Sequence, residues 1–185
     1  MKKRKVLDIQ LQKRRKNRWS IFLDDGSVFG VSEDVFFSIP IHIGDTITEQ
    51  VLNEILDSES KTKIYNSAIN LLSYRMRSKS ELKDRLIRKK YNEDSILDVI
   101  NNLELKGYLD DEKFAHAFAK EKVKNKLIGP IALKFEMSSH NLNVDLVDNV
   151  ISSVYQIFPQ EFIINKLITK WKVKDSIGKD PKIKG

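Results

Sequence analysis

An apolar pattern that recurs after 51 residues constrains the fold of this chain more than any other feature. Six apolar residues between positions 82 and 103 each have an apolar counterpart at this offset. Their spacing of three and four residues is typical of helices with one buried face. A pattern repeated at a fixed period predicts structural units in tandem. The matched pairs are Leu82 and Leu133, Leu86 and Met137, Ile96 and Val147, Val99 and Val150, Ile100 and Ile151, and Leu103 and Val154.

The first repeat is predicted to span residues 61–107 and to contain three helices. Ser78 and Glu81 form a capping box, in which each side chain satisfies a backbone N–H at the start of the second helix. The third helix follows Asn92 and ends at Gly107, which can adopt the left-handed conformation of a helix cap. The helix that opens the unit is lined by Ile64, Ala68, Leu71 and Leu72.

A second repeat is predicted over residues 108–157. Asp110 can cap a helix that runs from Asp111 to about Lys126. Gly129 and Pro130 begin the next helix, because proline is favoured in a first helical turn. Asn143 caps the third helix. The order of helices in the first repeat is therefore expected again.

An incomplete third repeat is predicted over residues 158–185. It begins at Pro159 and has one helix, with Phe162, Ile163, Leu167 and Trp171 along one face. Burial of one such side chain contributes about 1.5 to 3 kcal/mol, so a fully solvated stripe is unfavourable. We expect this segment to pack on the second repeat, to form a protein contact or to be poorly ordered.

The first 60 residues form a small β-hairpin and helix module in this interpretation. Lys5–Gln12, Trp19–Leu23 and Val28–Val31 have strand character, and Asp24–Ser27 supplies turn residues. Thr46 or Thr48 can cap a helix after these strands. That helix has an apolar stripe of Val51, Leu52, Ile55 and Leu56. The predicted fold class is mainly α: tandem three-helix repeats preceded by a small N-terminal β-hairpin and α module.

The net charge of +7 and the isoelectric point near 9.4 favour an anionic partner, most often nucleic acid. The charge is unevenly distributed. Residues 1–20 hold nine basic side chains against Asp8, whereas residues 21–60 hold nine acidic side chains and no lysine or arginine. Such blocks indicate either a surface that meets two kinds of partner or the solvated faces of ordinary helices. The absence of cysteine fits a reducing compartment, and no run is apolar enough to cross a bilayer, so we expect a cytoplasmic protein.

Clusters of lysine and arginine are the candidate partner-binding residues. The region from Ser73 to Lys90 holds eight basic residues against Glu81 and Asp84. Such a helix can hold phosphates or acidic side chains, or it can simply be a solvated helix. Further lysines lie four residues apart on later helices, where like charges favour a countercharge outside the helix. The candidates for contact with phosphates or an acidic protein surface are Arg75, Arg77, Lys79, Lys83, Arg85, Arg88, Lys120, Lys122, Lys124, Lys126, Lys134 and Lys170.

No catalytic or metal site is predicted. Asp110, Asp111 and Glu112 could hold a divalent ion, but acidic residues in a first helical turn are explained by capping and by the helix dipole. The three histidines have no ligand-like spacing. No phosphate-binding glycine loop or nucleophile motif is present. We therefore expect neither a cofactor nor a metal, and no enzymatic activity.

Five segments resemble the RecX family of regulatory proteins. Residues 68–82 read AINLLSYRMRSKSEL, and residues 107–115 read GYLDDEKFA. The first is similar to the family's Arg-x-Arg-Ser step followed by Glu-Leu. The second is similar to its Gly-Tyr-Leu-Asp-Asp box. Gly129–Pro130 with Leu133 and Glu136 resembles the family's Gly-Pro segment in the second repeat. Arg18–Leu23 and residues 30–33 resemble the β-region of its longer members.

The resemblance implies a curved array of three-helix repeats that binds the RecA recombinase and its filament on single-stranded DNA. It also implies inhibition of recombinase and ATPase activity, in DNA repair, recombination and the SOS response. It supplies no catalytic residues, and it places Leu82, Tyr108 and Phe114 in the core. Family members usually continue past an Asp-Pro step with two more helices, so we expect a chain that is either cut or naturally short. The alternative is a DNA-binding transcriptional regulator with helix-turn-helix-like units, since short helices and positive charge also describe that class.

Overall fold

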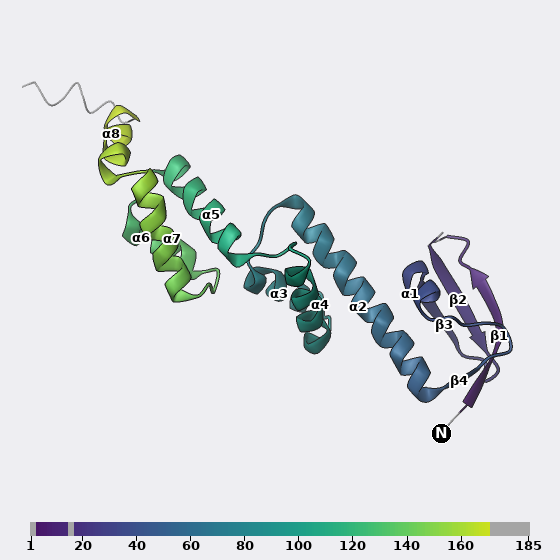
Figure 1. The fold of residues 1–185 in the computed structure, drawn as a ribbon. Helices are drawn as coiled ribbons and strands as arrows, with labels where there is room; N and C mark the ends of the chain where they lie inside the picture. Colours follow the sequence, from purple (N-terminus) through teal and green to yellow (C-terminus); the bar gives the residue numbers. More distant parts are fainter. Residues whose placement is uncertain (1–2, 15–16, 171–185) are drawn as a thin grey trace, which may run out of the picture. The chain divides into compact units, whose positions relative to one another are not determined.

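The computed structural model describes residues 3–14 and 17–170 of the chain, which fold into two compact units. The first unit contains the described chain up to Arg75 together with Lys83–Lys106, and the second contains Met76–Leu82 and the described chain from Gly107 onward. Figure 1 shows the order of the elements. They are β1 (Lys3–Leu11), β2 (Arg18–Leu23), β3 (Val28–Ser32), α1 (Glu33–Ser38), β4 (Thr46–Thr48), α2 (Glu49–Tyr74), α3 (Lys79–Arg88), α4 (Glu93–Leu105), α5 (Asp111–Lys126), α6 (Pro130–Ser138), α7 (Val144–Ile157) and α8 (Gln160–Lys170).

The N-terminal strands form one antiparallel sheet in the order β3-β2-β1-β4. The turn between β2 and β3 is closed by a hydrogen bond from the Leu23 amide to the Ser27 carbonyl. Gly26 has a φ of +81° in this turn, a conformation that suits glycine. These findings confirm the predicted strands and turn. The short helix α1 and the edge strand β4 were not predicted.

One face of the sheet is covered by α1 and by the beginning of α2 (Figure 1). A cluster of buried residues from the strands, α1 and α2 fills the space between them. Ile55 of α2 is fully buried there, and Thr48 caps the helix by accepting a hydrogen bond from the Val51 amide. Leu56 of the predicted stripe is instead 46% exposed. The other buried members are Val6, Ile21, Leu23, Val31, Val35, Ile41 and Ile47.

The prediction of two helices between residues 49 and 74 was wrong. A single helix of 26 residues, α2, occupies this range. Its sequence contains no proline or glycine, so no residue interrupts the backbone ladder. The change in the apolar pattern reflects a change of partner, because Ile55 packs under the sheet whereas the later part of α2 packs on α4. Ile64 and Ala68 are fully buried on that later part.

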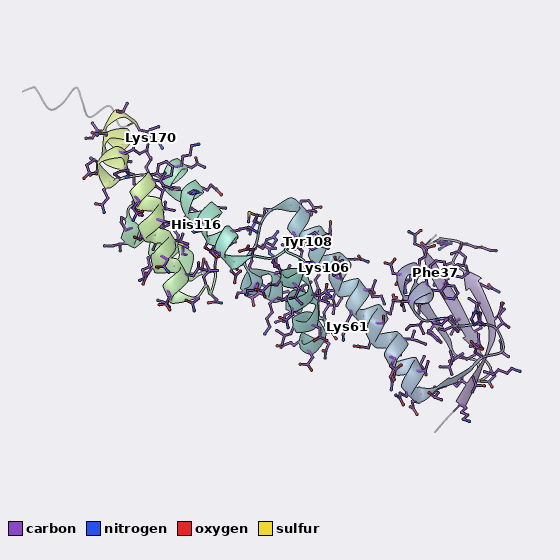
Figure 2. All side chains as sticks on the ribbon, in the orientation of Figure 1. Phe37, Lys61, Lys106, Tyr108, His116 and Lys170 are labelled. Carbon is purple, nitrogen blue, oxygen red and sulfur yellow. The ribbon has the colours of Figure 1, made fainter. Side chains whose placement is uncertain are left out.

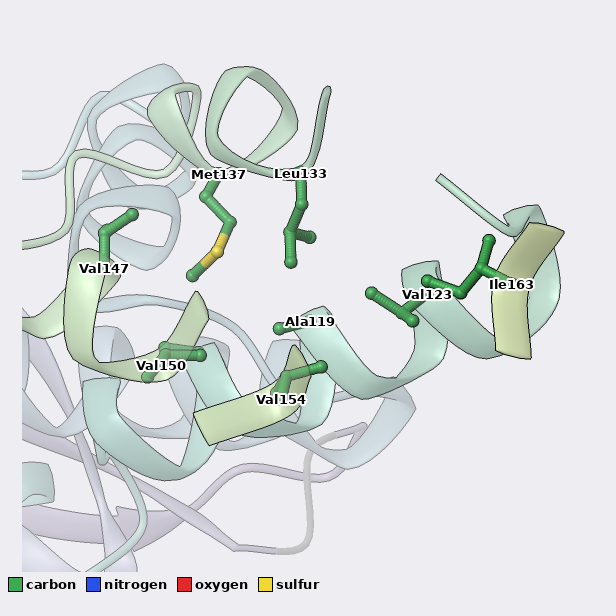
Figure 3. Close-up of a cluster of buried hydrophobic side chains, with 9 residues drawn as sticks. Ala119, Val123, Leu133, Met137, Val147, Val150, Val154 and Ile163 are labelled. Atoms are coloured by element: carbon green, nitrogen blue, oxygen red, sulfur yellow. The ribbon is translucent and has the colours of Figure 1, made fainter. Parts of the chain in front are cut away.

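The second unit is built around α5, α6 and α7, which pack on one another. Leu133 and Met137 of α6 point into their shared core, as Figure 3 shows. Both side chains are fully buried. The other buried members are Ala115, Ala119, Val123, Val147, Val150, Val154 and Ile163.

The structure confirms the predicted repeat pattern. Of the twelve residues in the six matched pairs, every one is buried except Ile151, which is partly buried. The helix caps also recur at the same offset, since Asn92 caps α4 and Asn143 caps α7 through their side-chain oxygens. The two repeats therefore bury equivalent positions and cap equivalent helices.

The described part of the third repeat is helix α8. Ile163 is buried in the core of the second unit, and Leu167 packs against that core. The predicted packing of this segment on the second repeat is therefore confirmed for these two residues, while Phe162 is 41% exposed. Trp171 lies outside the described residues. The division of the chain at residues 60, 107 and 157 stays a prediction.

Candidate functional site

The first turn of α3 is held in place by a set of hydrogen bonds inside the second unit. Ser78 is fully buried, and its Oγ accepts a hydrogen bond of 3.1 Å from the Glu81 amide, as the capping box predicts. The same hydroxyl donates to the carbonyl of His140 at 3.2 Å. The Lys79 amide donates to Asp111 Oδ1 at 2.8 Å. A basic helix therefore begins at a rigid point.

Arg77 differs from the other basic candidates because its side chain is only 7% exposed. Its guanidinium group forms an ion pair with the carboxylate of Glu81, four residues later. Truncating one partner of such a buried pair leaves the other charge uncompensated. In this structure Arg77 stabilises the approach to α3 and does not present its charge to solvent.

The remaining basic residues of α3 lie outside its apolar stripe. Leu82 and Leu86 are fully buried, whereas Lys83 and Arg85 are partly exposed and Arg88 is exposed. Lys83 Nζ lies 3.8 Å from Glu93 Oε2, a distance at which the attraction between exposed groups is weak. The charge of this helix remains accessible.

Two of the five lysines of α5 form ion pairs with one carboxylate of the same protein. Lys122 Nζ lies 2.5 Å from Glu136 Oε2, and Lys126 Nζ lies 2.8 Å from Glu136 Oε1. Hydrogen bonds from Lys122 and Lys126 lower the pKa of Glu136 to about 2. Glu136 is the countercharge that the i,i+4 spacing of these lysines calls for. It comes from α6, so sequence periodicity could not identify it.

Lys120 and Lys124 of α5 lie four residues apart and are both exposed. Lys134 of α6 is engaged instead, since its Nζ lies 2.5 Å from Asp148 Oδ1. Arg75 follows α2 and is exposed, and Lys170 is exposed at the end of α8, where Figure 2 labels it. The structure thus brings Lys122 and Lys126 together on one carboxylate, while the other candidates are spread over α3, α5, α6, α8 and the connection between α2 and α3.

The acidic run at the start of α5 has structural partners. Asp110 Oδ1 accepts a hydrogen bond of 2.9 Å from the Lys113 amide, which confirms its role as a helix cap. Asp111 caps a second helix, α3, which the sequence did not predict. Hydrogen bonds from the backbone and side chain of Lys113 lower the pKa of Asp110. Among residues 3–14 and 17–170 no group of three or more acidic, histidine or cysteine side chains could hold a metal ion.

The expected burial of Tyr108 was wrong. Its side chain, which Figure 2 labels, is 58% exposed, whereas Leu82 and Phe114 are buried as expected. The chain leaves α4 through Gly107, whose φ is +75°. Leu109 is 2% exposed and fills the interior position after this turn. The buried apolar side chain after α4 is therefore that of Leu109, one residue later than the Tyr108 that we expected.

Two family models match this chain. The model described as the regulatory protein RecX N-terminal domain matches residues 4–48. The model described as the first three-helix domain of RecX matches residues 65–103. Among the residues that the structure describes, no helix combines the length and hydropathy of a membrane span.

Curated relatives are about 30% identical to this chain over the aligned residues. The regulatory protein RecX of Listeria welshimeri is 31% identical over 147 residues, covering 80% of this chain and 55% of that protein. The regulatory protein RecX of Oceanobacillus iheyensis is 29% identical over 181 residues, covering 94% of this chain and 66% of that protein. The chain therefore spans little more than half the length of the first of these relatives.

Solved structures share the fold. A crystal structure of regulatory protein RecX matches with a TM-score of 0.74 and 22% identity, covering 96% of this chain and 86% of that chain. The crystal structure of RecX from Lactobacillus salivarius matches with a TM-score of 0.55 and 24% identity, covering 68% of this chain and 79% of that chain. At this identity the likeness concerns the fold, and it confirms the predicted class of helical repeats after a small strand module.

Proposed function

This chain belongs to the RecX family of regulatory proteins, and from that premise we propose that it binds the RecA recombinase on single-stranded DNA and inhibits its recombinase and ATPase activity. The proposal places the protein in the cytoplasm, in DNA repair and recombination. The relatives are named as regulatory proteins, which supports regulation by binding.

The observation that carries the proposal is the family match combined with accessible positive charge on its first three-helix domain. Residues 65–103 match that domain, and α3 within it carries Lys83, Arg85 and Arg88 outside the buried leucines. A filament on DNA offers phosphates together with acidic protein surface. Basic side chains on a rigidly anchored helix can bind both the phosphates and the acidic protein surface.

The structure refines which lysines of the second repeat are suited to such contacts. Lys120 and Lys124 project from α5 into solvent, whereas Lys122 and Lys126 are bound to Glu136. Removing the first pair takes away accessible charge. Removing the second pair takes away an equal formal charge but leaves a carboxylate exposed in its place.

The direct test is RecA ATP hydrolysis on single-stranded DNA, measured with increasing amounts of this chain. We expect suppression at saturation, and unchanged hydrolysis would contradict the proposal. Replacing Lys79, Lys83, Arg85 and Arg88 together by alanine should weaken filament binding and leave the helical signal intact, because alanine favours helix. Wild-type binding should also fall with salt, since each neutralised phosphate releases counterions.

A matched pair of variants tests the division of lysines on α5. Lys120→Ala/Lys124→Ala should weaken filament binding without loss of stability. Lys122→Ala/Lys126→Ala should destabilise the second unit, because Glu136 loses both of its partners. If both double variants bind the filament as well as the wild-type chain does, α5 does not contact it through these lysines. A sequence-specific DNA footprint without RecA would instead favour the transcriptional regulator.

A further inference from the structure

The first unit carries a groove that the basic helices do not explain. Its walls come from α1, α2 and α4, and its volume is about 680 Å³. Four carboxylates line it, from Asp34, Glu54, Asp57 and Asp98, against the two ammonium groups of Lys61 and Lys106. The groove therefore has a formal charge of −2, four minus two, in a chain whose net charge is +7.

Two carboxylates that line this groove already bind an ammonium group. Lys61 Nζ lies 3.1 Å from Asp57 Oδ2 and 2.8 Å from Asp98 Oδ2, so α2 and α4 hold one cation between them. Its neighbour Lys106 places Nζ 5.0 Å from the centroid of the Tyr65 ring, a cation–π contact. Figure 2 labels both lysines. Two ammonium groups of the chain itself therefore show that the walls of the groove bind cations.

Two other carboxylates of the groove are not neutralised in this way. Asp34 is exposed on α1, and Glu54 is exposed on α2, where it accepts a hydrogen bond of 3.2 Å from the uncharged Gln50 amide. A second hollow, shared with Glu54 and Asp57, extends this acidic surface to Glu49. The whole of residues 21–60 contains no lysine or arginine that could offset it.

We propose that the groove between α1, α2 and α4 docks a protein segment that carries lysine or arginine. The cationic side chains of that segment bind Asp34 and Glu54, next to the ammonium groups that the groove holds already. Nucleic acid does not suit this surface, because phosphates would meet four carboxylates. The inference rests on the proposed function and deepens it, since it assigns the acidic module to the protein component of the partner and leaves the phosphates to the basic helices.

The test measures binding of the full chain to a labelled helical peptide in which arginines recur at every fourth position, by fluorescence anisotropy. Asp34→Lys/Glu54→Lys should raise the dissociation constant by about tenfold, because two attractions become repulsions. Asp24→Lys/Glu121→Lys is the matched control, since it changes the net charge equally at exposed positions outside the groove. We expect its dissociation constant to stay within about twofold of the wild-type value. Asp34→Asn/Glu54→Gln replaces the reversal variant if that variant does not fold.

Several results would overturn the docking proposal. One is a wild-type chain that does not bind the peptide, and another is an equal loss in the control variant. A loss of affinity for single-stranded oligothymidine in the reversal variant would make nucleic acid the occupant. Wild-type self-association that the reversal abolishes would make a second copy the occupant.

The RecA assay separates this proposal from the proposed function. If RecA hydrolysis is unaffected by the wild-type chain while the peptide results hold, the proposed function fails and the groove assignment stands. If hydrolysis is suppressed while the reversal leaves peptide affinity unchanged, the groove assignment alone fails.

Discussion

Leu133→Ala should destabilise the second unit by about 3 to 4 kcal/mol. Leu133 is fully buried on α6, and its side chain points at a core formed by α5, α6 and α7 (Figure 3). Leucine-to-alanine changes at buried sites cost about 2.7 to 5 kcal/mol, depending on how far the surroundings relax into the cavity. Here Val123, Val150 and Val154 line the same core from other helices, and β-branched side chains have few alternative rotamers. We therefore expect little collapse around the cavity.

This loss should appear as a lower urea midpoint of the helical circular dichroism signal and as faster amide hydrogen exchange in α5, α6 and α7. Ile131→Ala is the matched control, because it lies on the same helix and also shortens an aliphatic side chain, but it is 88% exposed. Its effect should stay within about 0.5 kcal/mol. The packing argument is refuted if Leu133→Ala costs less than about 1 kcal/mol, or if both changes cost the same.

Three further predictions concern polar contacts. Because the pKa of Glu136 is lowered from 4.5 to about 2, its carboxylate stabilises the folded chain above pH 4.5, and this stability is lost as the pH falls toward about 2. Glu136→Gln should therefore make the urea midpoint depend less on pH in this range. Asp110→Ala removes the cap of α5 and should cost about 1 kcal/mol in urea denaturation, while Asp110→Asn should retain most of the stability. Arg18→Ala should cost about 2 kcal/mol in calorimetry, because Glu59, which is 2% exposed, loses its 2.6 Å ion pair with Arg18 and keeps only Lys63 at 3.3 Å and the Ser32 amide. A smaller loss in Arg18→Ala/Glu59→Gln would confirm the cause.

Periodicity and capping were sufficient to predict the repeats from the sequence. Both depend on residues close together along the chain, such as Asn92 and Ser95 at the start of α4. The same local rules could not show that α2 is continuous, because an amphipathic helix can change its buried face where its partner changes. Nor could they place β4, whose three residues pair with β1 some 40 positions earlier, such as Arg4 with Ile47.

The candidate site was less accessible to sequence reasoning than the fold. Lysine spacing identified the helices that carry charge but could not show which charges are neutralised. Arg77 and Arg88 belong to one basic run, yet one is buried beside Glu81 and the other is exposed. Glu59 is similar, because burial alone would raise its pKa, whereas hydrogen bonds from Ser32 and Arg18 lower it. Such pairings depend on tertiary contacts, and several of them join residues more than ten positions apart.

The two repeats share their interior but not their outer surface. At the offset of 51 residues, Arg85 of α3 corresponds to Glu136 of α6, and Ser80 and Asp84 correspond to Ile131 and Phe135. These two apolar side chains are 88% and 80% exposed, so packing in the second unit does not require them. The equivalent helices therefore cannot bind the same kind of surface: α3 suits phosphates, whereas the acid on α6 neutralises two lysines of α5. If both repeats contact the filament, we expect the second to do so through Lys120 and Lys124 of α5, which are exposed and are not bound by Glu136.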